Sequence, residues 1–281
     1  ITEPPLLLGS IVSFTNVTCN GNANGTISTN VSGGTSPYSH SWSNGMTTQN
    51  VTGLAPGTYR DTIRDSKGCV VIVSQAITEP GGAVGIPASS LSNTNVQCFG
   101  GSDGTASVLP SGGTLPYTIT WSNSDIGNAA DSLSAGVYTV TIEDGNLCTF
   151  DTIVTITEPA VLNSQFVNFS LTPAGTNITC NGDTDGNVRA SVFGGTPPYN
   201  YTWSDASTLD SITAKPAGTY WVHITDDHGC EYSDTTTLTE PSLLTNVLTK
   251  LDVVCKGESS GWIKTNVAGG SPVYTYLWSP L

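Results

Sequence analysis

Apolar and polar residues alternate with a period of two along many short stretches of this chain. The alternation is clearest eight, ten and twelve residues after four of the cysteines, where one face carries mostly apolar residues or threonine. These positions are Ile27, Thr29 and Val31; Ala106, Val108 and Pro110; Val188, Ala190 and Val192; and Ile263, Thr265 and Val267. Such alternation is typical of antiparallel strands with one buried and one solvated face. Pro110 fits only at an edge strand or at a strand's end.

A second alternating stretch follows each glycine pair and carries aromatic residues on one face. The pairs are Tyr38 with Trp42, Tyr117 with Trp121, and Tyr199 with Trp203. A third stretch begins at a tyrosine 40 residues after its cysteine, at Tyr59, Tyr138 and Tyr220. This last tyrosine resembles the tyrosine corner of immunoglobulin-like sandwiches. Because aromatic side chains bury large areas, we expect these nine residues, three in each unit, to form the centre of the three cores.

The same order of features occurs four times, so internal repetition dominates the organisation of the chain. Cys19, Cys98, Cys180 and Cys255 each precede a tryptophan by 23 residues, and Ile-Thr-Glu-Pro or Leu-Thr-Glu-Pro separates the units. We predict units at residues 1–80, 81–159 and 160–241, and a partial fourth at 242–281. Short strands between frequent turns predict an all-β fold, a tandem array of small immunoglobulin-like or fibronectin-like β-sandwich domains forming a beads-on-a-string rod. We expect the chain to be a segment of a longer protein.

Six of the seven cysteines form pairs with a constant spacing of 50 residues, which suggests a covalent staple within each unit. The predicted bridges are Cys19–Cys69, Cys98–Cys148 and Cys180–Cys230. Pairing across the connectors gives unequal separations of 29, 32 and 25 residues, for Cys69–Cys98, Cys148–Cys180 and Cys230–Cys255. Disulfides indicate an oxidising, extracellular setting. Reduced structural cysteines are the alternative.

The composition excludes several classes of partner. The net charge of −14 argues against binding to nucleic acid or to an anionic membrane surface. No run of about 20 apolar residues is present, so we expect no membrane insertion in this segment. Only 11% of residues are charged, so serine, threonine, asparagine and glycine must cover most of the surface.

The ordered motif Cys-Asn-Gly, Gly-Gly-Thr-x-Pro-Tyr, Trp-Ser, Gly-Thr-Tyr, Asp, Gly-Cys and Ile-Thr-Glu-Pro resembles the SprB-type repeat along the whole chain. The fourth unit departs from it at Ser271-Pro272-Val273 and stops early. SprB-type repeats occur in very large surface proteins of gliding flavobacteria and related Bacteroidota. The resemblance implies tandem β-domains of a secreted adhesin or surface filament.

Catalysis finds little support in the sequence, and we expect no enzyme activity and no cofactor. The histidines are dispersed: His40 lies on a predicted core strand and His228 in a turn, and no nucleophile elbow, zinc motif or phosphate loop is present. Asp61 occupies a predicted inward position for which the sequence suggests no reason. The acidic turns Gly182–Gly186 and Ser102–Gly104 allow a sporadic calcium site. The first unit has no carboxylate there, so no metal site is shared by every unit.

These observations predict a non-enzymatic structural and adhesive repeat segment of a large secreted bacterial protein, acting as a disulfide-stapled stalk or filament at the cell surface in adhesion or gliding. Its expected partners are other repeats of the same long chain, with surface polysaccharide or cell-envelope proteins as further candidates. The alternative is an array of carbohydrate-binding modules. Trp221 and Trp262 lie outside the repeat pattern and are the tryptophan candidates for a sugar platform.

The resemblance also implies covalent decoration, because the bacterial group concerned O-glycosylates Asp-Ser/Thr motifs followed by a small or aliphatic residue. Matching acceptors are Thr62, Ser132, Thr152, Ser211 and Thr235. Ser132 and Ser211 are the strongest candidates, because each precedes a predicted tyrosine corner, where we expect an accessible loop.

Overall fold

The computed structural model describes residues 3–168 and 175–279. Apart from a short 3-10 turn at Ala88–Ser90, every regular element in these residues is a β-strand. Within the same residues, no helix is long and apolar enough to cross a membrane. The all-β class predicted from the alternation is confirmed.

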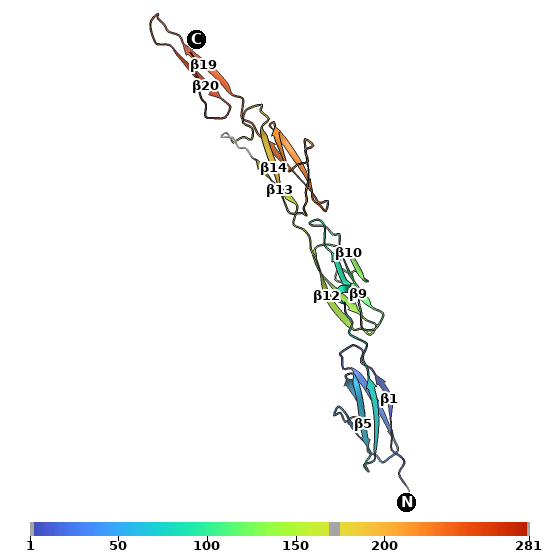
Figure 1. The fold of residues 1–281 in the computed structure, drawn as a ribbon. Coiled ribbons are helices and arrows are strands. Elements are labelled where there is room, and N and C mark those ends of the chain that lie inside the picture. Colours follow the sequence, from blue (N-terminus) through green and yellow to red (C-terminus); the bar gives the residue numbers. More distant parts are fainter. Residues whose placement is uncertain (1–2, 169–174, 280–281) are drawn as a thin grey trace. The chain divides into compact units, whose positions relative to one another are not determined.

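The strands form pairs of three-stranded antiparallel sheets, and each pair is one sandwich (Figure 1). In the first sandwich one sheet has the order β1-β2-β4 and the other has the order β3-β5-β6. Their bounds are β1 Leu8–Thr15, β2 Gly25–Ser32, β3 Ser39–Trp42, β4 Asn50–Leu54, β5 Gly57–Arg64 and β6 Val70–Ile77. The chain therefore changes sheet between β2 and β3, between β3 and β4, and between β4 and β5.

The second and third sandwiches repeat this topology. The second consists of β7 Leu91–Thr94, β8 Gly104–Val108, β9 Thr118–Trp121, β10 Ala129–Leu133, β11 Gly136–Glu143 and β12 Thr149–Ile156. The third consists of β13 Asn163–Asn168, β14 Gly186–Phe193, β15 Asn200–Trp203, β16 Ser211–Lys215, β17 Gly218–Thr225 and β18 Glu231–Leu238. A two-stranded sheet of β19 Thr245–Leu251 and β20 Trp262–Ala268 follows. Strand β8 ends two residues before Pro110, which is why a proline is tolerated there.

The chain divides into two compact units. The first contains residues 1–95 and 102–157, and the second contains residues 96–101 and 158–281. The first unit therefore holds the first sandwich and the strands of the second. The boundaries expected after residues 80, 159 and 241 stay a prediction.

Side chains from both sheets fill each core. In the first sandwich Ile27 and Val51 from one sheet pack with Trp42 and Ile77 from the other. In the third, Val188 and Ile212 pack with Trp203 and Val222. These are the inward positions of the alternating pattern, so burial of apolar area explains why the strands pair in this register.

The first sandwich buries a polar pair, His40 and Asp61, at positions that hold Ile119 and Val140 in the second sandwich and Tyr201 and Val222 in the third. Asp61 is fully buried, and its carboxylate Oδ2 lies 2.6 Å from Nδ1 of His40, whose side chain is 8% exposed. Its Oδ1 also accepts a hydrogen bond of 3.1 Å from the backbone N–H of Ser41. Burial of a carboxylate is costly unless its oxygens are hydrogen-bonded. His40 thus explains the inward aspartate that the sequence left without a reason.

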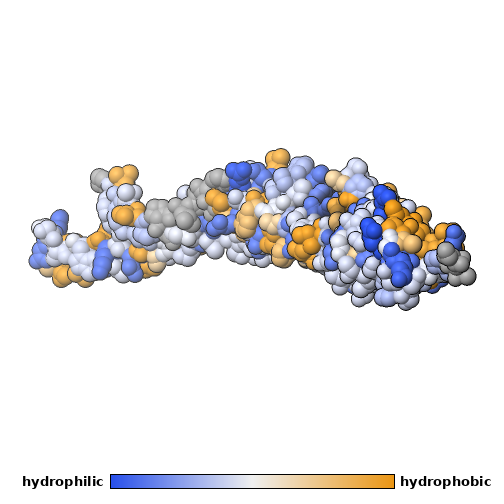
Figure 2. Space-filling view, turned by 90° about the horizontal axis from the view of Figure 1, so that it is seen from below, coloured by the Kyte–Doolittle hydropathy of each residue, from blue (hydrophilic) through white to orange (hydrophobic). Residues whose placement is uncertain are grey.

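The surface of the protein is largely polar. In the space-filling view, white and blue residues cover most of the visible face, and hydrophobic residues form separate orange patches (Figure 2). This agrees with outward strand positions rich in serine and threonine, such as those of β18.

Candidate functional site

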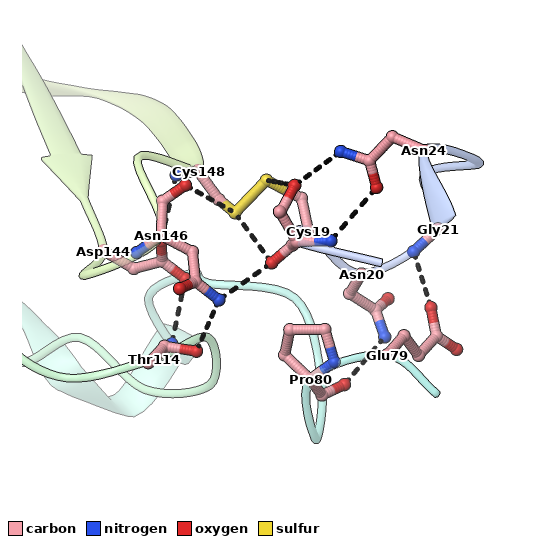
Figure 3. Close-up of a disulfide and its surroundings, with 11 residues drawn as sticks. Cys19, Asn20, Gly21, Asn24, Glu79, Pro80, Thr114, Asp144, Asn146 and Cys148 are labelled. Atoms are coloured by element: carbon pink, nitrogen blue, oxygen red, sulfur yellow. Dashed lines mark hydrogen bonds between the residues drawn. A yellow bond between two sulfur atoms is a disulfide. The ribbon is translucent and has the colours of Figure 1, made fainter. Parts of the chain in front are cut away.

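Each sandwich has a cysteine in the loop before its second strand. In the first, this cysteine loop spans residues 16–24 and packs on the segment that leaves β6. The backbone N–H of Gly21 donates to Glu79 Oε2 at 2.7 Å, and Asn20 Nδ2 donates to the carbonyl of Pro80 at 3.4 Å (Figure 3). Glu158 accepts from Gly100 and Glu240 from Gly182 in the same way, at 2.6 and 2.7 Å. The Thr-Glu-Pro motif therefore holds the cysteine loop at the end of the sandwich where the chain exits.

The second cysteine lies at the opposite end, in the turn between the last two strands. This cysteine hairpin spans residues 65–69, 144–148 and 226–230 in the three sandwiches. In each, the leading aspartate is buried and its carboxylate accepts backbone N–H groups. Asp144 accepts from Thr114, Asn146 and Cys148, each at 2.9 Å. The sequence indicated a turn here but not this buried carboxylate, although an aspartate stands four residues before each of these cysteines.

Hydrogen bonding controls the charge state of these aspartates. Burial by itself raises the pKa of the Asp144 carboxyl, but its backbone N–H donors lower it by more, so the pKa lies below its ordinary value. The same causes lower the pKa of Asp65 and of Asp226. The hairpins are therefore built around ionised carboxylates at neutral pH.

The glycine pair of the repeat lies against this hairpin. Gly113 has a φ of 59°, and a Cβ placed on it would collide with the Asp144 carboxylate and with Val84. Gly34 and Gly195 face Asp65 and Asp226 in the same way. Glycine is needed at this position because both the backbone conformation and the space exclude a side chain.

The disulfides join a cysteine loop to the cysteine hairpin of the next sandwich. Cys19 bonds Cys148 with a Cα–Cα distance of 5.7 Å (Figure 3), and Cys98 bonds Cys230 with 5.6 Å. Cys69, Cys180 and Cys255 are free and exposed. The sequence separations are 129 and 132 residues.

The predicted bridges Cys19–Cys69, Cys98–Cys148 and Cys180–Cys230 are therefore wrong. Residues 50 apart lie at opposite ends of one sandwich, because the loop packs beside the end of the last strand and the hairpin beside its start. Bonded partners need Cα atoms within about 7 Å. Pairing of each loop with the following hairpin also joins equivalent positions of the repeat, although its sequence separations of 129 and 132 residues are unequal. Constant spacing was therefore not a valid reason to place each bond within one unit.

Polar contacts accompany the covalent bond. At the junction of the first and second sandwiches, Asn146 Nδ2 donates to the carbonyl of Thr18 at 3.0 Å and to Thr114 Oγ1 at 3.0 Å (Figure 3). At the junction of the Cys98 loop with the third sandwich, His228 Nδ1 lies 3.3 Å from the carbonyl of Gln97, which precedes Cys98 as Thr18 precedes Cys19. The hairpin residue two before each bonded cysteine thus contacts the carbonyl of the residue before its partner. His228, expected in a turn, belongs to this junction.

The predicted core aromatics divide into two groups. Trp42, Trp121 and Trp203 are 1–3% exposed, and each indole N–H donates to a carbonyl six residues further on. The tyrosines are only half-buried, and each hydroxyl donates to a backbone carbonyl. Tyr38, Tyr117 and Tyr199 bond Gly33, Gly112 and Gly194, and Tyr59, Tyr138 and Tyr220 bond the residue four before. The latter three have the hydroxyl-to-backbone bond of a tyrosine corner.

The predicted O-glycosylation acceptors all lie on strands. Thr62 is on the central strand β5 and follows the buried Asp61, and Thr152 and Thr235 are on β12 and β18. Ser132 and Ser211 are on β10 and β16, so the expectation of a loop there is wrong. Ser132 is exposed with a φ of 54°, and it adjoins a β-bulge that opens the strand pairing. Their occupancy stays a prediction.

The acidic turn considered for calcium is tied to its own loop. Asp185 accepts hydrogen bonds from the backbone N–H and the hydroxyl of Thr179, and these bonds lower its pKa. In the first sandwich Asn24 Oδ1 likewise accepts from the backbone N–H of Thr18, while Asn24 Nδ2 donates to the Thr18 hydroxyl. Among the described residues, no group of three or more metal-binding side chains is present.

An exposed tryptophan lies on the outer face of the third sandwich. Trp221 on β17 is 45% exposed and lines a shallow hollow with Thr202, His223, Asp234 and Thr235. His223 Nδ1 lies 2.9 Å from Ser233 Oγ. The equivalent positions in the other sandwiches are Arg60 and Thr139, so this aromatic surface is particular to the third sandwich.

Among the solved structures similar to the chain are arrays of immunoglobulin domains. Sidekick-1 immunoglobulin domains 1–5 match with a TM-score of 0.30 and 12% identity over 85% of this chain, which spans 60% of that chain. The N-terminal eight immunoglobulin domains of Down Syndrome Cell Adhesion Molecule match with a TM-score of 0.30 and 12% identity, over 94% of this chain and 40% of that chain. The insect immune protein hemolin matches with a TM-score of 0.23 and 11% identity, over 87% of this chain and 78% of its own. No curated protein matches the chain.

One sequence family matches the chain at four places. The sequence profile of the SprB repeat aligns with residues 11–47, 90–125, 172–208 and 248–281. Each match covers a cysteine loop, the strand after it and the glycine pair. Because the matches together cover half of the chain, the protein belongs to the SprB repeat family.

Proposed function

We propose that this chain is a non-catalytic structural and adhesive repeat segment of a large secreted bacterial surface protein, in which disulfides between consecutive sandwiches make a covalent stalk or filament used in adhesion or gliding. The SprB repeats support this assignment, and the resemblance to surface proteins of gliding bacteria supports a location outside the cell. The observation that carries the proposal is the bonding of each cysteine loop to the next hairpin.

Bonds at this position carry mechanical load. The connector from β6 to the second sandwich begins at residues 78–80, and the Cys19–Cys148 bond is a second covalent link between the same two sandwiches. A pulling force is then shared between the connector and a covalent cross-link. If the sandwiches unfold, the two bonds also limit how far the chain can lengthen, because the load runs through residues 1–19, 98–148 and 230–281.

Single-molecule pulling of the chain from both termini tests this role. At about 3.5 Å per residue, the reduced chain should reach roughly 980 Å and the oxidised chain roughly 420 Å. Cys148→Ser should lengthen the oxidised chain by about 100 Å, because the load then runs through residues 1–98 and 230–281. Cys69→Ser is the matched control and should change nothing, since Cys69 is free. Equal extension of the oxidised and reduced chains would refute the covalent stalk.

Carbohydrate binding is a second candidate, supported by the Trp221 surface. An exposed indole can stack on the apolar face of a sugar ring, and the neighbouring hydroxyl, imidazole and carboxylate groups can hydrogen-bond its hydroxyls. A glycan array probed with the chain and with Trp221→Ala tests it, with Trp262→Ala as the control for an exposed tryptophan on another strand. Loss of a specific signal in Trp221→Ala alone would support this function, and no glycan signal above background would exclude it for the glycans on the array.

A further inference from the structure

The two disulfides share one pairing rule, and no two of the three free cysteines can form a bond with each other that obeys it. Both disulfides join one loop cysteine to one hairpin cysteine that follows it in the chain. Of the free cysteines, Cys69 is in a hairpin, whereas Cys180 and Cys255 are in loops. Cys69 precedes both loops, so it cannot follow either of them in the same chain.

The loop that carries Cys180 is built like the two bonded loops. Its Gly182 donates to Glu240, as Gly21 donates to Glu79. Asp185 holds Thr179, as Asn24 holds Thr18. The loop is therefore held in place without a disulfide, and its thiol is exposed.

A second, independent contact marks this loop as half of a junction. Ser271 Oγ donates to the carbonyl of Thr179 at 3.3 Å. That carbonyl is equivalent to the carbonyl of Thr18, which accepts from Asn146 in the bonded junction. Ser271 directly follows the glycine pair Gly269-Gly270 and so corresponds to Thr114, which bonds both Asp144 and Asn146 of the hairpin. The segment after β20 thus already meets the loop at the place where a hairpin meets it in the first unit.

We propose that Cys180 is the attachment site for a further repeat and forms a disulfide with a cysteine hairpin placed C-terminal to Trp278. Every SprB-type repeat added to the chain would then contribute one more bond to its predecessor, in one direction only. This goes beyond the proposed stalk, because it assigns a bonding partner to a thiol that is free in the structure.

The bond forms by thiol–disulfide exchange with a small disulfide such as oxidised glutathione. The thiolate of one cysteine attacks the glutathione disulfide and releases one reduced glutathione, and the second cysteine thiolate then attacks the mixed disulfide and releases the other. The two thiols lose two electrons and two protons, and one oxidised glutathione becomes two reduced molecules.

An extended chain tests the proposal. Residues 204–241 are added directly after Trp278, so that the tryptophan strand continues as it does after Trp203. The added copy carries Glu231→Thr, the residue that follows Cys148, so that its cysteine peptide differs in mass from the original. After refolding in a glutathione redox buffer, non-reducing peptide mapping should recover a peptide that joins Cys180 to the added cysteine, with Cys255 reduced.

The same extension with Cys180→Ser is the matched control, and its added cysteine should stay reduced. A bond between Cys255 and the added cysteine would overturn the proposal, since it is the pairing within one repeat. An added cysteine that stays reduced beside Cys180 would also overturn it, whether or not the added strands fold, because the docked Ser271 would then not lead to the bond. Neither result bears on the pulling experiment, which uses the 281-residue chain.

Discussion

Removal of the buried carboxylate of the second hairpin is the sharpest test of how the junction is built. Asp144→Ala deletes the acceptor of three backbone N–H groups, those of Thr114, Asn146 and Cys148. A buried donor left without a partner costs about 1–3 kcal/mol. The hairpin lies at an end of the sandwich, where water can reach part of it, so we take about 1 kcal/mol for each donor and about 3 kcal/mol in total.

Peptide-resolved hydrogen exchange measures this loss where it occurs. A loss of about 3 kcal/mol corresponds to a fall of roughly 10²-fold in the protection of β11 amides. Asp144→Asn keeps one oxygen for Asn146 and Cys148, so it should lose about one bond and lower protection by less than tenfold. Protection of β17, in the other unit, should not change.

Asp151→Ala is the matched control, because Asp151 is an exposed aspartate on the neighbouring strand β12. It should leave β11 protection within about threefold of the parent chain. A fall of less than tenfold in Asp144→Ala, or an equal fall in Asp151→Ala, would refute the reasoning that the carboxylate organises the hairpin through its backbone partners.

Three further predictions concern packing, backbone strain and pH. Trp121→Ala should destabilise the second sandwich by about 3–5 kcal/mol, because it empties a core position that is 3% exposed. The loss should appear as faster hydrogen exchange of β9 and β11, and a loss below about 1 kcal/mol would contradict the prediction. Ala214 has a φ of 55°, and the equivalent residue of the first sandwich is Gly53, with a φ of 71°. Ala214→Gly should therefore raise the melting temperature by a few degrees, and Gly53→Ala should lower it. A lower melting temperature for Ala214→Gly would argue against strain at this bulge. The folded pKa of Asp144 lies below its unfolded value, so its contribution to stability should be complete above about pH 4 and lost as the pH falls further. Protection of β11 that stays independent of pH between about 5 and 2.5, after correction for intrinsic exchange, would exclude this linkage.

Local pattern determined the strands and the turns of this protein. Alternation placed Ile27, Val108 and Val188 inward, and the fixed distance from cysteine to tryptophan marked Trp42, Trp121 and Trp203, all of which are buried. Strand formation depends on near neighbours and on burial of one face, and both are written in a few consecutive residues. The all-β class followed from that information alone.

Some side-chain roles needed the third dimension. The half-burial of Tyr38 and the pairing of His40 with Asp61 depend on which strands lie side by side and how far each residue is from the sandwich edge. Ser132 was expected in an accessible loop because it precedes the predicted tyrosine corner, but it lies on β10 beside a bulge. Sequence spacing along one strand carries no information about these neighbours.

The disulfide partners were decided by tertiary structure alone. Sequence showed that the loop and hairpin cysteines are equivalent from repeat to repeat, and more than one pairing scheme preserves that equivalence. Cys69 and Cys19 lie at opposite ends of one sandwich, whereas Cys148 meets Cys19 because the second sandwich docks its hairpin on the loop of the first. A disulfide requires two sulfur atoms within bonding distance, and that distance is set by how the folded ends meet rather than by the number of residues between them.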